Sequence, residues 1–368
     1  MNVTIQDLID DARTLPIVPL KEAALYHENI SDLTRDVDES MRSLPTINTL
    51  IGHNPLQVMY DNHRNHAAFM AAVFSIGSYE LLVQTLPWVY RSYSAHRFSY
   101  DYFPLELQAW IDAIEKKQNQ SMQTIVAVYQ WMIQKHEAIV FLSNDNEKAP
   151  PPVDEQYMER KNSFQAGLLR GDHTACLDIA RETVGNSRDI EGFYLHIIQP
   201  SMYEIGMLWE RASISVAQEH LASAIVSRIM AAVNMTALES KPHKCKAVIS
   251  SAPNEFHEIG AWMIADVLTC EGWDIRYLGA NTPHDALMDL LKSFKPDHLG
   301  LSVTMAFNVE KVREMIREIK NDPSLKSISI IVGGRVFNDI PDLWKKIGAD
   351  GFASNLSEAR RLFEKKKS

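Results

Sequence analysis

Cysteine is scarce in this sequence of 368 residues. The three cysteines lie far apart, at Cys176, Cys245 and Cys270. This spacing matches neither a disulfide framework nor a cysteine-based metal motif, so it excludes a small disulfide-stapled fold. Scattered cysteines are typical of a reducing compartment, and we expect the protein to be cytoplasmic.

Long apolar runs are also absent. No stretch approaches the roughly 20 apolar residues that a membrane-spanning helix needs, although 46% of the residues are hydrophobic. The acidic start, MNVTIQDLIDDARTLP, lacks the basic region and apolar core of a secretory signal peptide. We therefore expect no membrane partner, and we expect a chain of this length to form two or three globular domains.

Positive charge is the third shortage. The formal net charge is −10, and the first 150 residues carry 18 acidic and 11 basic side chains, a net charge of −7. A DNA-reading module normally presents a basic face to the phosphates. We therefore expect no direct DNA binding.

What the sequence has in quantity is helical periodicity. Residues 1–148 predict an all-helical N-terminal domain that is rich in aromatic residues. Three consecutive prolines mark residues 149–155 as a linker, because proline interrupts both helices and strands. Residues 156–240 predict four helices with short connections, which together form a four-helix bundle.

The pattern changes in the last third of the chain. From residue 244 to residue 368, short β-rich runs such as KAVISS alternate with helical segments in five βα units. This alternation predicts an α/β domain with a doubly wound parallel sheet, a Rossmann-like and flavodoxin-like fold. Ligands of such sheets bind at the carboxyl ends of the strands.

The first predicted strand of this domain ends in SAPNEFHEIG, residues 251–260. Glu255 and His257 therefore lie in the loop after the strand, and Gly260 lies at the start of the next helix. Such a histidine can bind a metal through one ring nitrogen while the other donates to the carboxylate two residues away, which fixes the tautomer. Gly260 lets the backbone lie close to a bulky planar ligand. The alternative is a loop histidine without a ligand, because isolated short motifs are weak.

Further residues extend this motif. Ser302 and Thr304 end the third predicted strand, and Gly333 and Gly334 end the fourth. With Glu-x-His-x-x-Gly, they resemble the cobalamin-binding domain shared with methionine synthase and the mutases. In that family the histidine replaces the cofactor's own benzimidazole at cobalt, and the nucleotide tail runs into the sheet beside the serine and the glycines, whose bare backbone leaves a slot for it. The resemblance implies that His257 is the cobalt ligand.

A second motif lies in the predicted bundle. Nine residues separate Trp209 from the pair Glu219 and His220, in the segment LWERASISVAQEH. This spacing resembles the helical module of light-sensing adenosylcobalamin proteins, the carotenoid-gene repressors and their relatives, which also use Glu-x-His-x-x-Gly. The resemblance covers residues 155–368. It implies that Trp209 packs over the adenosyl group of adenosylcobalamin, and that Glu219 and His220 contact that group. The alternative is a core tryptophan beside a solvated helix face.

The sequence departs from these relatives in three ways. Glu255 stands where most cobalamin domains have aspartate, which leaves the geometry of its hydrogen bond to His257 open. Glu210 stands where the repressors have a histidine that binds cobalt after illumination, so water, Glu210 or another histidine has to take that place. The sequence also shows no match to the repressors' MerR-type DNA-binding domain, in agreement with its acidic charge.

The N-terminal helical domain resembles no family that we can name. Histidines among aromatic residues in a helical fold can line a pocket for a second tetrapyrrole, such as biliverdin or haem. The favoured alternative is an aromatic core beside a surface for a protein partner or a second copy of the chain. The histidines are His63, His66, His96 and His136, and the aromatic residues are Trp88, Tyr90, Tyr93, Phe98, Tyr100, Tyr102 and Phe103.

These patterns favour a signalling photoreceptor over an enzyme. In this interpretation, light cleaves the Co–C bond of adenosylcobalamin and the bundle moves. The alternative is a corrinoid carrier protein for methyl transfer. Trp209 discriminates between the two, because a carrier needs an accessible upper corrin face that a capping tryptophan obstructs. A mutase subunit is disfavoured, since no substrate barrel is evident.

Overall fold

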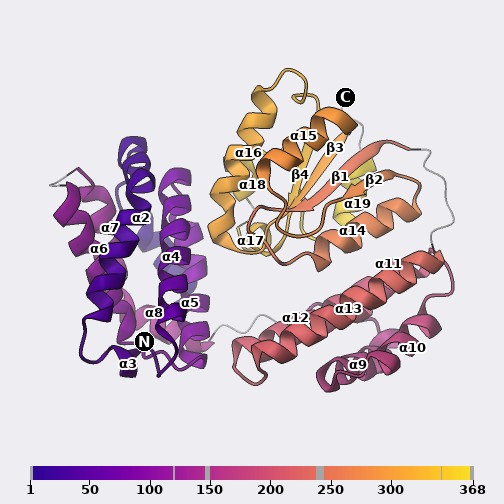
Figure 1. Cartoon of the computed structure of the whole chain (residues 1–368), viewed down its shortest axis with the longest axis horizontal. Coiled ribbons are helices and arrows are strands. Elements are labelled where there is room, and N and C mark those ends of the chain that lie inside the picture. The colour runs from indigo at the N-terminus through magenta and orange to yellow at the C-terminus, as the bar shows by residue number, and fades with distance from the viewer. Residues whose placement is uncertain (1–2, 119–120, 146–149, 238–243, 341, 365–368) are drawn as a thin grey trace. The chain divides into compact units, whose positions relative to one another are not determined.

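The computed structural model describes residues 3–118, 121–145, 150–237, 244–340 and 342–364 (Figure 1). The chain divides into two compact units, one formed by residues 1–147 with 306–310 and the other by residues 148–305 with 311–368. None of the described helices is long and apolar enough to cross a membrane.

The first unit is all-helical, as the sequence predicts. Large aromatic side chains fill its core, and Tyr26, Trp110 and Tyr129 are fully buried. The hydroxyl groups of Tyr26 and Tyr129 lie 2.9 Å apart and share a hydrogen bond, as buried hydroxyls generally require. The helices are α1 (Ile5–Ala12), α2 (Leu20–Arg42), α3 (Ile47–Leu50), α4 (Leu56–Ile76), α5 (Tyr79–Ala95), α6 (Tyr102–Gln118), α7 (Gln123–Gln134) and α8 (His136–Asp145).

The second unit begins with the predicted helical bundle. The predicted third helix is interrupted by a π-helical turn, η1, which joins α11 to α12. Pro200 gives a physical reason for this turn, because proline lacks an N–H group and its ring crowds the carbonyl four residues earlier. The wider turn relieves that conflict. The elements are α9 (Glu155–Arg170), α10 (His173–Thr183), α11 (Asp189–Phe193), η1 (Tyr194–Ile198), α12 (Gln199–Glu210) and α13 (Val216–Ala237).

A five-stranded parallel sheet follows, with the strand order β2-β1-β3-β4-β5. This order confirms the predicted doubly wound, flavodoxin-like fold. The central strands are buried and apolar, as expected for a sheet covered on both faces. The strands are β1 (Lys246–Ser251), β2 (Asp274–Tyr277), β3 (His298–Ser302), β4 (Ser329–Gly333) and β5 (Gly351–Ala353). The helices are α14 (Ile259–Cys270), α15 (His284–Phe294), η2 (Ala306–Asn308), α16 (Val309–Asn321), α17 (Arg335–Asp339), α18 (Leu343–Lys346) and α19 (Leu356–Glu364).

The bundle and the α/β domain share one hydrophobic core. Met263 and Val267 of α14 and Leu356 of α19 belong to the same buried cluster as Phe193 and Ile197 of the bundle. Burial of apolar surface is the main favourable term in such a contact. The second unit is therefore a single packed body, although its sequence pattern falls into two parts.

Gly334 fixes the backbone at the carboxyl end of β4. Its φ angle is 103°, a conformation that favours glycine. A Cβ atom added there would lie 2.3 Å from the carbonyl oxygen of Val303. The packing at the end of β4 thus requires glycine at this position, independently of any ligand.

We expect Gly334→Ala to destabilise the second unit by at least about 2 kcal/mol, because it combines a steric clash with backbone strain. Gly206→Ala is the matched control, since a Cβ at Gly206 meets no atom within 4 Å; there we expect stability to stay equal or to rise by up to about 1 kcal/mol. Thermal unfolding followed by circular dichroism measures both. Equal unfolding midpoints for the two variants would contradict this assignment.

Candidate functional site

The site lies where the strand order of the sheet reverses. The chain runs from β1 outward to β2 and then returns to place β3 on the other side of β1. Ser251, Ser302, Gly333 and Ala353 end four neighbouring strands and pair in register across the sheet. The loops after β1 and β3 therefore leave the sheet side by side, which is where ligands of doubly wound sheets bind.

Glu255 connects these two loops. One carboxylate oxygen, Oε1, lies 2.5 Å from Nδ1 of His257 and accepts a hydrogen bond from the His257 backbone N–H at 3.2 Å. The other oxygen, Oε2, accepts from the backbone N–H groups of Thr304 at 2.9 Å and Met305 at 2.8 Å. Glutamate in place of aspartate thus reaches both the imidazole and the loop after β3.

The protonation state of this pair follows from its contacts. Burial alone would raise the pKa of Glu255, but hydrogen bonds from His257 and from the backbone N–H of Met305 outweigh burial and hold that pKa at about 2. The carboxylate is therefore ionised at neutral pH and accepts the Nδ1–H of His257. This tautomer leaves the lone pair of Nε2 available to a metal.

The surroundings of His257 leave it accessible while its partner is enclosed. The His257 side chain is 59% exposed, whereas that of Glu255 is fully buried. The Ser251 hydroxyl donates to the backbone carbonyl of His257 at 3.2 Å, so the end of β1 also positions the histidine. At Gly260, an added Cβ would meet no atom within 4 Å, which leaves open space where α14 begins.

The other predicted residues of the α/β domain lie at the same edge of the sheet. Ser302, Thr304, Gly333 and Gly334 are all partly exposed there. The contribution of Thr304 that the structure records is its backbone N–H rather than its hydroxyl. Neither this contact nor that of Met305 could be inferred from the sequence, because every residue other than proline carries a backbone N–H.

The predicted residues of the bundle gather at the turn between α12 and α13. Trp209 and Glu210 end α12; Trp209 is partly exposed and Glu210 is buried. Glu219, in the first turn of α13, accepts a hydrogen bond from the Ser223 hydroxyl at 2.8 Å. His220 is exposed, with Nε2 at 3.6 Å from a Glu219 carboxylate oxygen. Trp209 thus lies at the end of α12, and Glu219 and His220 lie at the start of α13.

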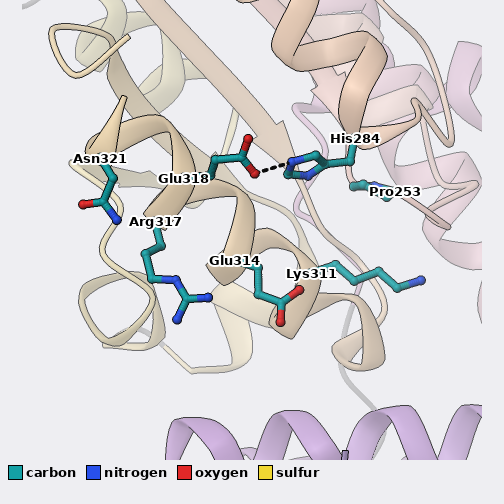
Figure 2. A pocket seen from close by; sticks show the side chains of 7 residues that line it. All are labelled: Pro253, His284, Lys311, Glu314, Arg317, Glu318 and Asn321. Carbon is teal, nitrogen blue, oxygen red and sulfur yellow. Dashed lines mark hydrogen bonds and ion pairs between the residues drawn. The ribbon is translucent and has the colours of Figure 1, made fainter. Parts of the chain in front are cut away.

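A separate open pocket of about 620 Å³ lies between the loop after β1, the start of α15 and one face of α16 (Figure 2). In its wall, Nε2 of His284 and a carboxylate oxygen of Glu318 are 2.7 Å apart. Charges of both signs face this pocket, and it lacks the apolar lining of most cofactor sites. We assign no ligand to it. Its lining residues are Pro253, His284, Lys311, Glu314, Arg317, Glu318 and Asn321.

The histidines of the N-terminal unit are engaged by their neighbours. His63 is fully buried, with Nδ1 at 2.6 Å from Asp38 and Nε2 at 2.6 Å from the Tyr102 hydroxyl. Nδ1 of His136 lies 3.2 Å from the Tyr90 hydroxyl, and Nδ1 of His96 lies 2.8 Å from a backbone carbonyl.

A cavity beside Tyr90 and His66 in this unit measures about 20 Å³, which is room for about one water molecule. A second tetrapyrrole finds no support in this packing. The aromatic residues of the region form a packed core, as one part of the favoured alternative predicts. The interaction surface stays a prediction.

Comparison with known protein families identifies the second unit. A family model described as a B12 binding domain matches residues 245–360, and a second model with the same description matches residues 161–234. The chain belongs to the cobalamin-binding family. The cobalamin domain, residues 245–360, contains Glu255 and His257, and the other matched segment contains Trp209, Glu219 and His220.

Curated relatives include transcriptional repressors and corrinoid proteins. The transcriptional repressor CarA of Myxococcus xanthus is 28% identical over 191 residues, covering 51% of this chain and 62% of CarA. The repressor CarH of the same organism is 25% identical over 175 residues, covering 47% of this chain and 57% of CarH. Dimethylamine corrinoid protein 1 of Methanosarcina acetivorans is 25% identical over 161 residues, covering 43% of this chain and 74% of the relative.

Among solved structures, the chain is similar to the monomethylamine corrinoid protein of Methanosarcina barkeri. It is 19% identical, covers 56% of this chain and 98% of its own, and gives a TM-score of 0.48.

The residues present fit a cobalamin on two observations. The donor is an exposed imidazole whose other nitrogen is held by a buried carboxylate, which is the usual arrangement for a metal-bound histidine. The open space at Gly260 admits a bulky planar ligand beside the start of α14.

We expect His257→Ala to remove the protein nitrogen beneath cobalt, so that cobalamin binds weakly and without the spectrum of a histidine-bound cobalt. Glu255→Gln should weaken binding about 10- to 100-fold, because the imidazole loses its fixed orientation. Absorbance titration with hydroxocobalamin measures both. The control is Glu258→Gln, a neighbouring carboxylate that accepts a hydrogen bond from Tyr277 rather than from the histidine. Parent-like affinity and spectrum in His257→Ala would overturn the ligand assignment.

Proposed function

We propose that this protein is a cobalamin-dependent photoreceptor that signals through movement of its helical bundle. The observation that carries the proposal is the α12–α13 turn, where Trp209, Glu219 and His220 gather in a bundle that shares its core with the cobalamin domain. The resemblance of these residues to those of light-sensing adenosylcobalamin proteins supports it, as do the matches to CarA and CarH.

The residues would act as follows. His257 holds the lower face of the cofactor, and Trp209 covers the upper ligand with its partly exposed ring. Glu219 and His220 offer polar contacts to that ligand. When bound, adenosylcobalamin supplies a cobalt–carbon bond that green or shorter-wavelength light breaks. Trp209, Glu219 and His220 would lose contacts if the adenosyl group left, and a difference in contacts of this kind shifts a conformational equilibrium.

The second candidate is a corrinoid carrier for methyl transfer. The similarity to dimethylamine corrinoid proteins favours it, and a site built on His257 and Glu255 serves either function. A carrier must expose its upper corrin face to partner enzymes. The position of Trp209 therefore separates the two candidates experimentally.

We expect the protein to bind adenosylcobalamin in preference to methylcobalamin, and green light to change the absorption spectrum of the adenosylcobalamin complex. Trp209→Ala should bind the two cobalamins about equally, because the pocket shaped for the adenosyl group is lost. Trp344→Ala is the control, a partly exposed tryptophan of α18 on which Lys345 packs. If Trp209→Ala keeps both the parent preference and the parent photolysis rate, the tryptophan is only a packing residue. That result would favour the carrier function over the photoreceptor.

We expect the illuminated spectrum to resemble aquocobalamin with a lower histidine, because Glu210 offers oxygen and not nitrogen to cobalt. Spectra of the parent and of Glu210→His after illumination measure the difference, and the histidine variant should shift toward a two-nitrogen spectrum. A two-nitrogen spectrum in the parent would show that another histidine, such as His220, takes the upper position. His220→Ala would then abolish that spectrum.

A further inference from the structure

A buried carboxyl group lies between the bundle and the cobalamin domain, and neither the cobalt site nor the α12–α13 turn uses it. Asp266 sits in the middle of α14 and is 3% exposed. Its neighbours Met263 and Val267 belong to the hydrophobic core that the two parts share. A polar group is costly to bury unless it is hydrogen-bonded, so its partners indicate its role.

Two separate elements of the bundle converge on this carboxyl. The Tyr194 hydroxyl of η1 donates to Oδ2 of Asp266 at 2.6 Å. The side-chain amide of Asn234, on α13, donates to Oδ1 at 2.5 Å. Asp266 thus joins α14 to two elements of the bundle, η1 and α13. Both hydrogen bonds break if the bundle separates from α14.

We propose that Asp266 is a proton-sensitive latch that holds the helical bundle on the cobalamin domain. The latch deepens the proposed function and rests on it in one respect: it would set how readily the bundle moves when the upper ligand is lost. Closure of the latch itself requires neither cobalamin nor light.

The ionisable groups nearest to Asp266 are weak acids. They are Tyr194 of η1, Cys270 of α14 and Tyr277 of β2. Burial raises the pKa of all three groups, and the charge of Asp266 raises each pKa further. None of them can neutralise a carboxylate.

The basic side chains of the packed elements are engaged or exposed elsewhere. Arg360 of α19 pairs with Glu191 at 3.1 Å and also with Glu271. Arg228, the charged residue of α13 nearest in sequence to Asn234, is exposed. His298 of β3 packs against the rings of Trp273 and Phe363. The carboxyl of Asp266 is therefore held by neutral donors.

This environment favours the protonated form while the bundle is docked. Burial raises the pKa of Asp266 to about 7, although hydrogen bonds from Tyr194 and Trp262 favour the ionised form. The amide oxygen of Asn234 is buried and has no hydrogen-bond partner among the described residues. A protonated Asp266 can donate to that oxygen once the amide turns over, which keeps the latch closed.

The sign of the pH dependence follows by linkage. On undocking, the carboxyl returns to water and its pKa falls toward the ordinary value of 3.8. The docked form then binds more protons than the undocked form between pH 3.8 and about 7, so rising pH weakens docking across that window and has no further effect above it. With these values, the docking constant falls about tenfold between pH 6 and pH 8.

The test is hydrogen–deuterium exchange of the full-length, cofactor-free protein at pH 6 and pH 8, corrected for the intrinsic exchange rate. We expect protection of residues 194–198 and 259–270 to be about tenfold lower at pH 8. Asp266→Asn keeps the shape of the side chain and removes its proton equilibrium, so its protection should be equal at the two pH values. Tyr194→Phe should lower protection at both values while keeping the pH dependence.

The matched control is Tyr157→Phe, which removes a hydroxyl from a bundle tyrosine whose ring stacks on His196. It should behave like the parent, and circular dichroism checks that every variant is folded. Protection in the parent that is the same at pH 6 and pH 8, or a pH dependence that persists in Asp266→Asn, would overturn the latch. Because neither cobalamin nor light enters this test, a latch that closes as expected in a protein without a light response would count against the photoreceptor alone.

Discussion

The hydrogen bonds of one carboxylate organise the whole site. Glu255 uses one oxygen for the imidazole of His257 and the other for two backbone N–H groups after β3. Because these loops leave the sheet where the strand order reverses, the carboxylate ties together two segments that are about 50 residues apart in sequence and adjacent in the fold. A fully buried, ionised carboxylate needs hydrogen-bond donors to offset its loss of hydration. The positions of the two loops and the tautomer of His257 therefore depend on the same set of hydrogen bonds.

Helix α14 connects the two halves of the second unit. It starts two residues after His257, at the open space beside Gly260, and its middle carries the apolar residues and the carboxyl group that meet the bundle. A rigid helix transmits a shift at one end to the other more directly than a loop does. The loop that carries His257 precedes this helix, and the surface that packs on the bundle lies along its middle.

The sequence was sufficient to predict the elements that depend on a local residue pattern. Alternating apolar strands and helices predicted the sheet, and Glu-x-His-x-x-Gly placed Glu255 and His257 in the loop after β1. It was insufficient where the interaction is made by the backbone or across the fold. The N–H groups of Thr304 and Met305 leave no residue-specific signal. Asp266 reads as an ordinary polar residue within a helical pattern, because its burial depends on a bundle that lies earlier in the chain. The compact packing around His63 and His66 likewise depends on contacts between distant helices.

The π-helical turn η1 has a geometric consequence for the upper part of the site. A π turn holds one residue more than an α turn, and each residue of an α-helix advances it by about 100°. The extra residue at Tyr194–Ile198 therefore rotates all of α12 by about that angle relative to the helix that α11 begins. The direction in which Trp209 points is set fifteen residues upstream of the tryptophan, at the turn that accommodates Pro200. In this bundle the orientation of the Trp209 ring therefore depends on a proline nine residues earlier in the same helix.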